Sequence, residues 1–564
     1  LWAVDAGGAT SINGLSDGTT PATNNVGLGS TALDSITTGD ENTALGINAL
    51  TANTTANKNV GIGYLALQAT TTGGDNVGVG VGALYTNTTG TQNIAIGKSA
   101  LQANTTGGYN TALGKDTLRA NTTANSNTAI GEAALRSNTT GADNTSIGSA
   151  SLLDNTTGSY NASIGYESLA NNTTASNNVA VGYRALKTNT TGADNTATGK
   201  GTLQANTTGA ENVAVGRTAL TSNTTASYNT AVGVGSLATN TTGASNTAVG
   251  QGALYANLGA SNNTATGKDA LNANTTGASN TATGFKSMFL NTTGLQNAAF
   301  GYEALYSNTS GNYNIGLGIT ALGANTTGDN NVAIGRLALT GNTTADDNTA
   351  VGMYSLSKNT TGTDGSALGS AALTANTTGS SNTAIGRLSL TANTTGASNS
   401  AVGAGSLLTN TTGADNVAVG VSSLRLNSTG CRNTAVGFES GKATTTGVEN
   451  TFIGRKAGLA HTTGNNNSVL GSFAFTSNTE GTGNVAVGKS ALTSNTTAAC
   501  NTAVGLEALT NATTGNRNTA VGSCSLYTNT TGTRNLALGH QALKANTEGA
   551  DNTAVGNDSL DANT

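Results

Sequence analysis

The residues that suggest chemistry first are asparagines followed two positions later by serine or threonine. The motif recurs with a 17-residue period, and Asn-x-Ser/Thr is an acceptor for N-linked glycans where it lies on an exposed turn. Asn-Thr-Thr-Gly is also a favourable turn sequence, so a structural role is the alternative interpretation. The candidate acceptors are Asn53, Asn104, Asn121, Asn138, Asn155, Asn189, Asn206 and Asn223.

Groups that could catalyse a reaction or hold a metal are scarce. The only histidines, His461 and His540, lie in different parts of the sequence, and no nucleophile motif or metal-ligand spacing occurs. Acidic residues are scattered through the turns without the repeat of calcium-binding β-rolls, so we interpret them as solvated charges. Cys431, Cys500 and Cys524 are too far apart for a bridge within the chain. We expect no enzyme activity, no cofactor and no metal site.

The whole sequence from residue 25 follows one period. Aligned on Asn-x-x-x-Gly, residues 25–564 form 32 repeats with a 17-residue period and without an insertion, and the last repeat is incomplete. Numbering each repeat from its first asparagine, position 5 is glycine in all 32 repeats and position 1 is asparagine in 31. Position 9 is leucine in 28 repeats, and positions 3 and 8 are almost always small. The first complete examples are Asn42, Asn59 and Asn76 at position 1, Gly46, Gly63 and Gly80 at position 5, and Leu50, Leu67 and Leu84 at position 9.

Composition and charge exclude several classes of protein. Of 564 residues 78 are glycine, only one is proline, and charged residues make up 9%, against roughly 25% in ordinary soluble domains. The sparse proline excludes collagen. The net charge of −5 is too weak to favour a nucleic-acid partner, and no apolar run is long enough for membrane insertion.

The positions indicate a coil with an inside and an outside. A 17-residue repeat is too short for a pair of helices, and its β-branched segments favour strands. We predict an all-β fold, a parallel β-solenoid or β-roll, with two short strands and two turns in each coil. The leucines of position 9 and the aliphatic residues of position 4 would form the core, and the asparagines of position 1 would form an amide ladder. We assign positive φ to the glycines of position 15 and a bend or close approach to those of position 5.

Positions 3 and 8 indicate close packing, because a solvent-facing position has no reason to stay small. Either the opposite wall of a thin coil or another chain packs there, and we favour another chain. This predicts a homo-oligomer, a homotrimer or filament, that self-associates along positions 3 and 8.

Repeats 25–27 depart from the pattern. Position 9 becomes Gly441, Gly458 and Phe475, whereas position 3 acquires Phe452 and Val469. Large and small residues have exchanged places, so we predict a compensated core, with a bend or docking site as the alternative. Residues 1–24 lack the period and are expected to be a cap or the end of a preceding segment.

Repeats such as Asn433-Thr-Ala-Val-Gly-Phe-Glu-Ser and Asn450-Thr-Phe-Ile-Gly-Arg-Lys-Ala resemble the head repeats of trimeric autotransporter adhesins and the repeat stalks of phage tail fibres. The resemblance covers residues 25–564 and implies a parallel β-roll, three chains side by side, and display outside the cell. The 17-residue repeats are longer than those typical of adhesin heads.

The expected function is that of a structural and adhesive shaft of an extracellular fibre or surface filament, located at a cell or virion surface. A phage tail-fibre stalk is one alternative. An ice- or glycan-binding repeat surface is another, because threonines recur at positions 13 and 14. Surface glycans or host receptors are the partners that adhesion would require.

Overall fold

The computed structural model describes residues 24–562, and this range contains strands and turns but no helix. The chain divides into two compact units, one ending at Ser279 and the other beginning at Asn280. We call each folded repeat a coil and number the coils as the repeats, so that the first unit holds coils 1–15 and the second holds coils 16–32. The predicted cap over residues 1–24 falls almost entirely outside the described residues.

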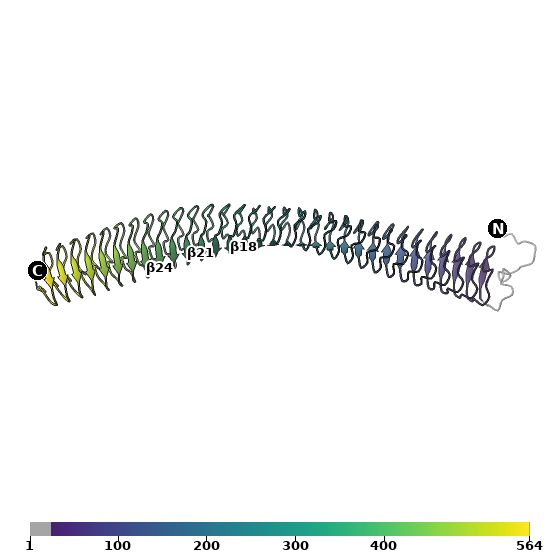
Figure 1. The fold of residues 1–564 in the computed structure, drawn as a ribbon, viewed down its shortest axis with the longest axis horizontal. Helices are drawn as coiled ribbons and strands as arrows, with labels where there is room; N and C mark the ends of the chain where they lie inside the picture. The colour runs from purple at the N-terminus through teal and green to yellow at the C-terminus, as the bar shows by residue number, and fades with distance from the viewer. Residues whose placement is uncertain (1–23, 563–564) are drawn as a thin grey trace, which may run out of the picture. The chain divides into compact units, whose positions relative to one another are not determined.

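Every coil carries one strand of three residues, formed by positions 2–4. Within each unit the strand pairs in parallel with that of the next coil, and each residue lies opposite its counterpart one repeat later, as Thr196 does opposite Val213. Figure 1 shows one strand arrow in each coil, with β18, β21 and β24 labelled. The predicted all-β parallel solenoid of 17-residue coils is therefore confirmed.

The strands of the first unit are β1 (Val26–Leu28), β2 (Thr43–Leu45), β3 (Val60–Ile62), β4 (Val77–Val79), β5 (Ile94–Ile96), β6 (Thr111–Leu113), β7 (Thr128–Ile130), β8 (Thr145–Ile147), β9 (Ala162–Ile164), β10 (Val179–Val181), β11 (Thr196–Thr198), β12 (Val213–Val215), β13 (Thr230–Val232), β14 (Thr247–Val249) and β15 (Thr264–Thr266). Those of the second unit are β16 (Thr281–Thr283), β17 (Ala298–Phe300), β18 (Ile315–Leu317), β19 (Val332–Ile334), β20 (Thr349–Val351), β21 (Ser366–Leu368), β22 (Thr383–Ile385), β23 (Ser400–Val402), β24 (Val417–Val419), β25 (Thr434–Val436), β26 (Thr451–Ile453), β27 (Ser468–Leu470), β28 (Val485–Val487), β29 (Thr502–Val504), β30 (Thr519–Val521), β31 (Leu536–Leu538) and β32 (Thr553–Val555).

The second strand that we predicted in each coil is replaced by turns. In coil 3 the backbone N–H of Ala66 donates to the carbonyl of Gly63 at 3.2 Å, and that of Thr70 donates to Leu67 at 3.2 Å. Hydrogen bonds between coils continue through this segment, since the N–H of Leu67 donates to Ala83 at 2.9 Å. The backbone is thus satisfied without a second strand.

The leucines of position 9 adopt a left-handed backbone conformation, which explains why no strand forms there. Leu50 and Leu67 have φ of +51° and +53° and are fully buried. The left-handed conformation costs a bulky residue about 1–2 kcal/mol, and burying a leucine contributes about 2 kcal/mol. Burial therefore offsets the strain. The glycines of position 15, such as Gly73, lack the positive φ that we assigned to them.

The glycines of position 5 combine a backbone requirement with a close approach. Gly63 has a φ of +129°, and a Cβ placed on it would lie 2.6 Å from the carbonyl oxygen of Gly80 in the next coil. Gly46 and Gly80 repeat this arrangement with φ of +140° and +134°. Both predictions for position 5, the bend and the close approach, are confirmed.

The core is formed by positions 3, 8 and 9. Leu50, Leu67, Leu84 and Ala44 are fully buried, and a Cβ placed on Gly61 at position 3 would lie 3.3 Å from the Leu50 Cγ of the preceding coil. Position 3 therefore packs against the leucine across a thin coil. Our assignment of position 4 to the core is wrong, as the side chains of Leu45 and its counterparts point outward.

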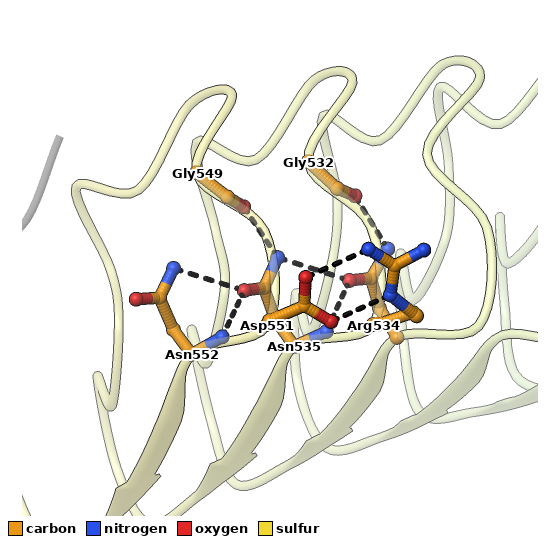
Figure 2. A network of polar contacts seen from close by, with 7 residues as sticks. Gly532, Arg534, Asn535, Gly549, Asp551 and Asn552 are labelled. Carbon is orange, nitrogen blue, oxygen red and sulfur yellow. Dashed lines mark hydrogen bonds and ion pairs between the residues drawn. The ribbon is translucent and has the colours of Figure 1, made fainter.

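The asparagines of position 1 form the predicted amide ladder. The Nδ2 and the backbone N–H of Asn76 both donate to the Oδ1 of Asn59, at 3.1 and 3.0 Å, and Asn59 bonds to Asn42 in the same way. Figure 2 shows a C-terminal stretch of the ladder, in which Asn552 donates to Asn535 and Asn535 to the Gly549 carbonyl. The ladder satisfies buried polar groups that would otherwise destabilise the core.

The asparagines of position 12 form a second ladder that the sequence did not lead us to expect. The Nδ2 of Asn206 donates to the Oδ1 of Asn189 at 2.8 Å and to the carbonyl of Gly209 at 2.8 Å. The Oδ1 of Asn206 in turn accepts from Asn223 at 2.9 Å. The Asn206 side chain thus connects three successive coils and also forms a hydrogen bond within the turn of its own coil.

The compensated core of coils 25–27 is confirmed. Phe452 is fully buried and its ring occupies the space next to Gly441 and Gly458, where a Cβ on Gly458 would collide with it. Phe475 is also fully buried, and His461 lies near both rings, with centroid distances of 5.0 Å to Phe452 and 6.3 Å to Phe475. Strands β25 to β27 keep the regular register.

Candidate self-association surface

The outer face of the strands is an apolar surface, which we call the strand face. Successive side chains of a strand point to opposite sides, so the burial of position 3 directs positions 2 and 4 to the outside. Leu45, Leu368 and Leu470 at position 4 are 46%, 51% and 50% exposed. The face consists of positions 2 and 4 of coils 1–15 in the first unit and of coils 16–32 in the second.

The strand face is uncharged, and its position 4 is rich in aliphatic residues. Position 4 is aliphatic in 28 of the 32 repeats, with Thr198, Thr266, Thr283 and Phe300 as the exceptions. Position 2 is mostly threonine or valine, and positions 1–5 contain no charged residue. Contiguous exposed apolar patches of this kind mark interaction surfaces.

The extent of the face suits a protein interface. Three residues at about 3.3 Å each and a strand spacing of about 4.8 Å give the 15 strands of the first unit a footprint of about 700 Å². A stable interface buries about 800 Å² on each partner. The strand face of one unit is therefore comparable in extent to one side of such an interface.

Position 6 borders the strand face with a mixed row of aromatic, aliphatic and charged side chains. Tyr166 and Tyr183 stack at 5.5 Å between ring centroids, as do Phe285 and Tyr302 at 5.4 Å. Beside the first pair, hydrogen bonds from Lys187 and Arg184 hold the pKa of Glu167 below its usual value, against an opposing effect of burial. The charged residues of the chain thus begin where the apolar face ends.

Positions 3 and 8, through which we predicted self-association, are not on the surface. Ala44 and Ala49 are fully buried within a single chain, and so are their counterparts in the regular coils. They are small because the opposite wall of the coil packs against them. Contact with another copy along these positions is therefore excluded in the folded chain.

The position 12 asparagines that we named as candidate glycan acceptors are buried in the folded chain. A glycan would replace a hydrogen on Nδ2, and this nitrogen is buried and donates its hydrogens to the turn and, where the ladder is continuous, to the preceding asparagine. The affected residues, all fully buried, are Asn53, Asn104, Asn121, Asn138, Asn155, Asn189, Asn206 and Asn223. The structural alternative accounts for the motif, because Asn53 Oδ1 also accepts the N–H of Ala56 at 3.0 Å.

The remaining candidate groups are dispersed. The three cysteines are free thiols, and no group of histidine, cysteine and acidic residues within residues 24–562 could hold a metal ion. Asp551 at position 17 pairs with Arg534 of the preceding coil at 2.7 Å (Figure 2), and this pairing lowers the pKa of Asp551. The threonines of position 13 donate to the next coil, as Thr71 does to the Thr88 carbonyl at 3.2 Å.

Two signals in the sequence indicate that position 12 is buried and that position 3 points inward. At position 12 the asparagine is replaced in only five repeats, by Ile36, Thr70, Thr444, His461 and Ala512. The absence of any charged replacement at a polar position indicates burial. In a three-residue strand, the position that stays small marks the crowded side, so position 3 rather than position 4 had to point inward.

Searches against protein-family models and curated proteins find no match to this chain. No helix in the part of the chain that the structure describes is long and apolar enough to cross a membrane.

Proposed function

We propose that this chain is a structural, non-enzymatic shaft of an extracellular fibre or surface filament, in which copies associate side by side through the strand face. The observation that carries the proposal is the uncharged strand face, which has an aliphatic residue at position 4 in 28 of the 32 repeats. Leaving this face in water is unfavourable by roughly 25 cal/mol for each Å² of apolar area. A second copy of the chain covers it with a surface of the same length and period.

The regular coil supports a mechanical role. Each coil adds one strand and the same hydrogen bonds, so stability is distributed over many equivalent contacts between neighbouring coils. The described coils have no inserted loop that could form a catalytic cleft. A homotrimer is the assembly that the resemblance to adhesin heads favours, and receptors or glycans at a cell or virion surface would be its external partners.

The association is tested by measuring the mass of the full chain in solution by light scattering. We expect a multiple of the single-chain mass of 55.1 kDa. Lysine at Val215, Val232 and Val249, which are 37%, 37% and 38% exposed on the strand face, should shift the protein to a single chain. These substitutions place charges on a surface that association would remove from water.

A matched variant separates this effect from a general effect of added charge. Lysine at Tyr109, Tyr160 and Tyr228, which lie at position 17 and are more exposed, should leave the mass unchanged. A wild-type chain that is a single chain at all concentrations would overturn the proposal. An equal loss of association in both variants would show that the chains do not associate specifically through the strand face.

A further inference from the structure

His461 occupies a buried position without hydrogen-bond partners suited to a charged ring. Its side chain is fully buried, and its Nδ1 has no hydrogen-bond partner. Its Nε2 lies 3.3 Å from the Nδ2 of Asn467. That nitrogen already donates to Asn450 Oδ1 and to the Gly481 carbonyl, each at 2.9 Å, so both of its hydrogens are engaged.

The position 12 ladder is interrupted around His461. Where other coils stack asparagine on asparagine, coils 24–27 present Asn427, Thr444, His461 and Asn478 in succession. Each of these four residues has a buried polar atom without a hydrogen-bond partner. The described chain has six such atoms in all, so most of its unsatisfied side-chain polarity is concentrated in one short segment.

The charged groups of these coils do not face His461. The ring contacts Phe452, Phe475 and Asn467. The charged side chains of coils 25–27 lie at outward positions 6, 7, 10, 14 and 17 and are exposed or half-buried, namely Glu439, Lys442, Glu449, Arg455, Lys456 and Glu480. The desolvation that follows from burial is the cause that lowers the pKa of His461 to about 4.

Protonation would therefore place a charge where nothing stabilises it. The imidazolium carries a proton on both ring nitrogens, and the one on Nε2 would point at the Asn467 amide nitrogen, which is itself a donor. In the arrangement of the folded coil neither N–H of the imidazolium meets an acceptor, since Nδ1 has no partner and Nε2 faces a donor. No counterion faces the ring, and a buried charge in this state is strongly destabilising. Opening of the coil lets water solvate the ring.

We propose that protonation of His461 opens coils 25–27 at acidic pH while the neighbouring coils stay folded, which makes this segment a pH-sensitive break in the array. The inference concerns a single chain and does not depend on self-association. The pKa of His461 in the folded coil lies below its ordinary value of 6.5. The free energy that keeps coils 25–27 closed therefore has its full value above pH 6.5 and decreases as the pH falls toward 4. From these values the opening equilibrium rises about 30-fold between pH 7.5 and pH 5.

Hydrogen exchange of the full chain, corrected for intrinsic rates, tests this proposal. Amides in residues 433–483 should lose protection about 30-fold between pH 7.5 and pH 5, whereas coils 20–23 of the same unit should not. His461→Asn restores the asparagine of the other coils and should abolish the loss. His540→Asn, at an exposed histidine, should leave it unchanged. Equal losses in the wild type and His461→Asn, or losses in all coils alike, would overturn the proposal.

A second measurement uses the wild-type sequence, so its result does not depend on whether a variant folds. The sequence contains two histidines, so a chain labelled only at histidine rings gives two signals in carbon NMR. The His461 ring should stay neutral in the folded coil and become protonated only together with the loss of local protection. A His461 signal that titrates near pH 6.5 while protection is retained would contradict the proposal.

Discussion

Coils 10–13 of the first unit and coils 25–27 of the second have the same backbone and different interiors. Strands β12 and β26 both span three residues and keep the 17-residue register. In the regular coils the interior is filled by a leucine at position 9 and an alanine at position 3, both fully buried, as Leu203 and Ala214 are. In the other coils Phe452 packs against two glycines. The coil-to-coil hydrogen bonds therefore fix the backbone, and the interior needs a filled volume more than a particular residue.

The two regions differ in how well their polar groups are satisfied. The position 12 ladder is continuous through Asn189, Asn206 and Asn223. At Thr444 and His461 the side chains of position 12 have polar atoms without hydrogen-bond partners. Volume can be exchanged between positions because packing is local and non-directional. A hydrogen-bond ladder cannot be repaired in this way, because each amide needs its partner one coil away.

The largest effect is expected from Phe452→Ala, which empties the core of coil 26. Removing a fully buried phenylalanine should lower the free energy of unfolding by about 4 kcal/mol. Adding Gly441→Leu and Gly458→Leu restores the regular pattern and should recover much of the loss. The φ of these glycines, +55° and +61°, matches the leucines of position 9. Urea unfolding followed by circular dichroism measures both effects, and an absence of recovery would show that the interiors are not interchangeable.

Gly216→Ala in the regular coils should have the next largest effect. The added Cβ would lie 2.6 Å from the Gly233 carbonyl oxygen at a φ of +127°, and strain together with overpacking should cost about 3 kcal/mol. The matched variant, Gly458→Ala, collides with the Phe452 side chain, so Phe452→Leu should relieve it. No side-chain substitution should relieve Gly216→Ala. Equal rescue in both cases would contradict the close backbone approach.

Asn206→Ala should cost about 2 kcal/mol, because it removes the ladder partner of the buried Asn189 Oδ1 and of one hydrogen of the buried Asn223 Nδ2. The comparison is Thr70→Ala in coil 3, which removes a hydroxyl that has no partner in the structure. This second change should cost much less. Thermal unfolding of both variants tests the ladder, and similar losses would show that volume rather than hydrogen bonding explains position 12.

Arg534→Ala should have the smallest effect. The pair with Asp551 is exposed on both sides, and exposed ion pairs contribute little to stability. Unfolding curves of the variant and the wild type should coincide at neutral pH. A clear destabilisation would mean that the outer positions carry part of the fold.

The period, the glycine of position 5, the leucine core and the ladder of position 1 could be predicted because each is one physical requirement repeated in nearly every coil. The direction of position 4 could not be inferred from hydrophobicity, because Leu45 and its counterparts are apolar and yet lie outside. The left-handed leucines were also missed, since intrinsic preference argues against that conformation and only the packed coil offsets its cost.

The surface could be predicted only in part, because the sequence does not directly show which side chains of a thin coil face inward. Small residues such as Ala44 suggested an interface, but in a thin coil the opposite wall lies close enough to impose the same restriction. The Asn-Thr-Thr motif suggested glycan acceptors, because a sequence motif does not reveal whether its amide is buried. Both questions depend on which side of a three-residue strand faces inward.

The measurement that tests self-association most directly is cross-linking through one engineered cysteine. In a chain with Cys431, Cys500 and Cys524 replaced by serine, Val232→Cys places a thiol on the strand face. Tyr228→Cys places one nearby, at exposed position 17. We predict covalent dimers on oxidation of the Val232→Cys chain and none for the Tyr228→Cys chain. No linkage through Val232→Cys, or equal linkage through both, would contradict association through the strand face.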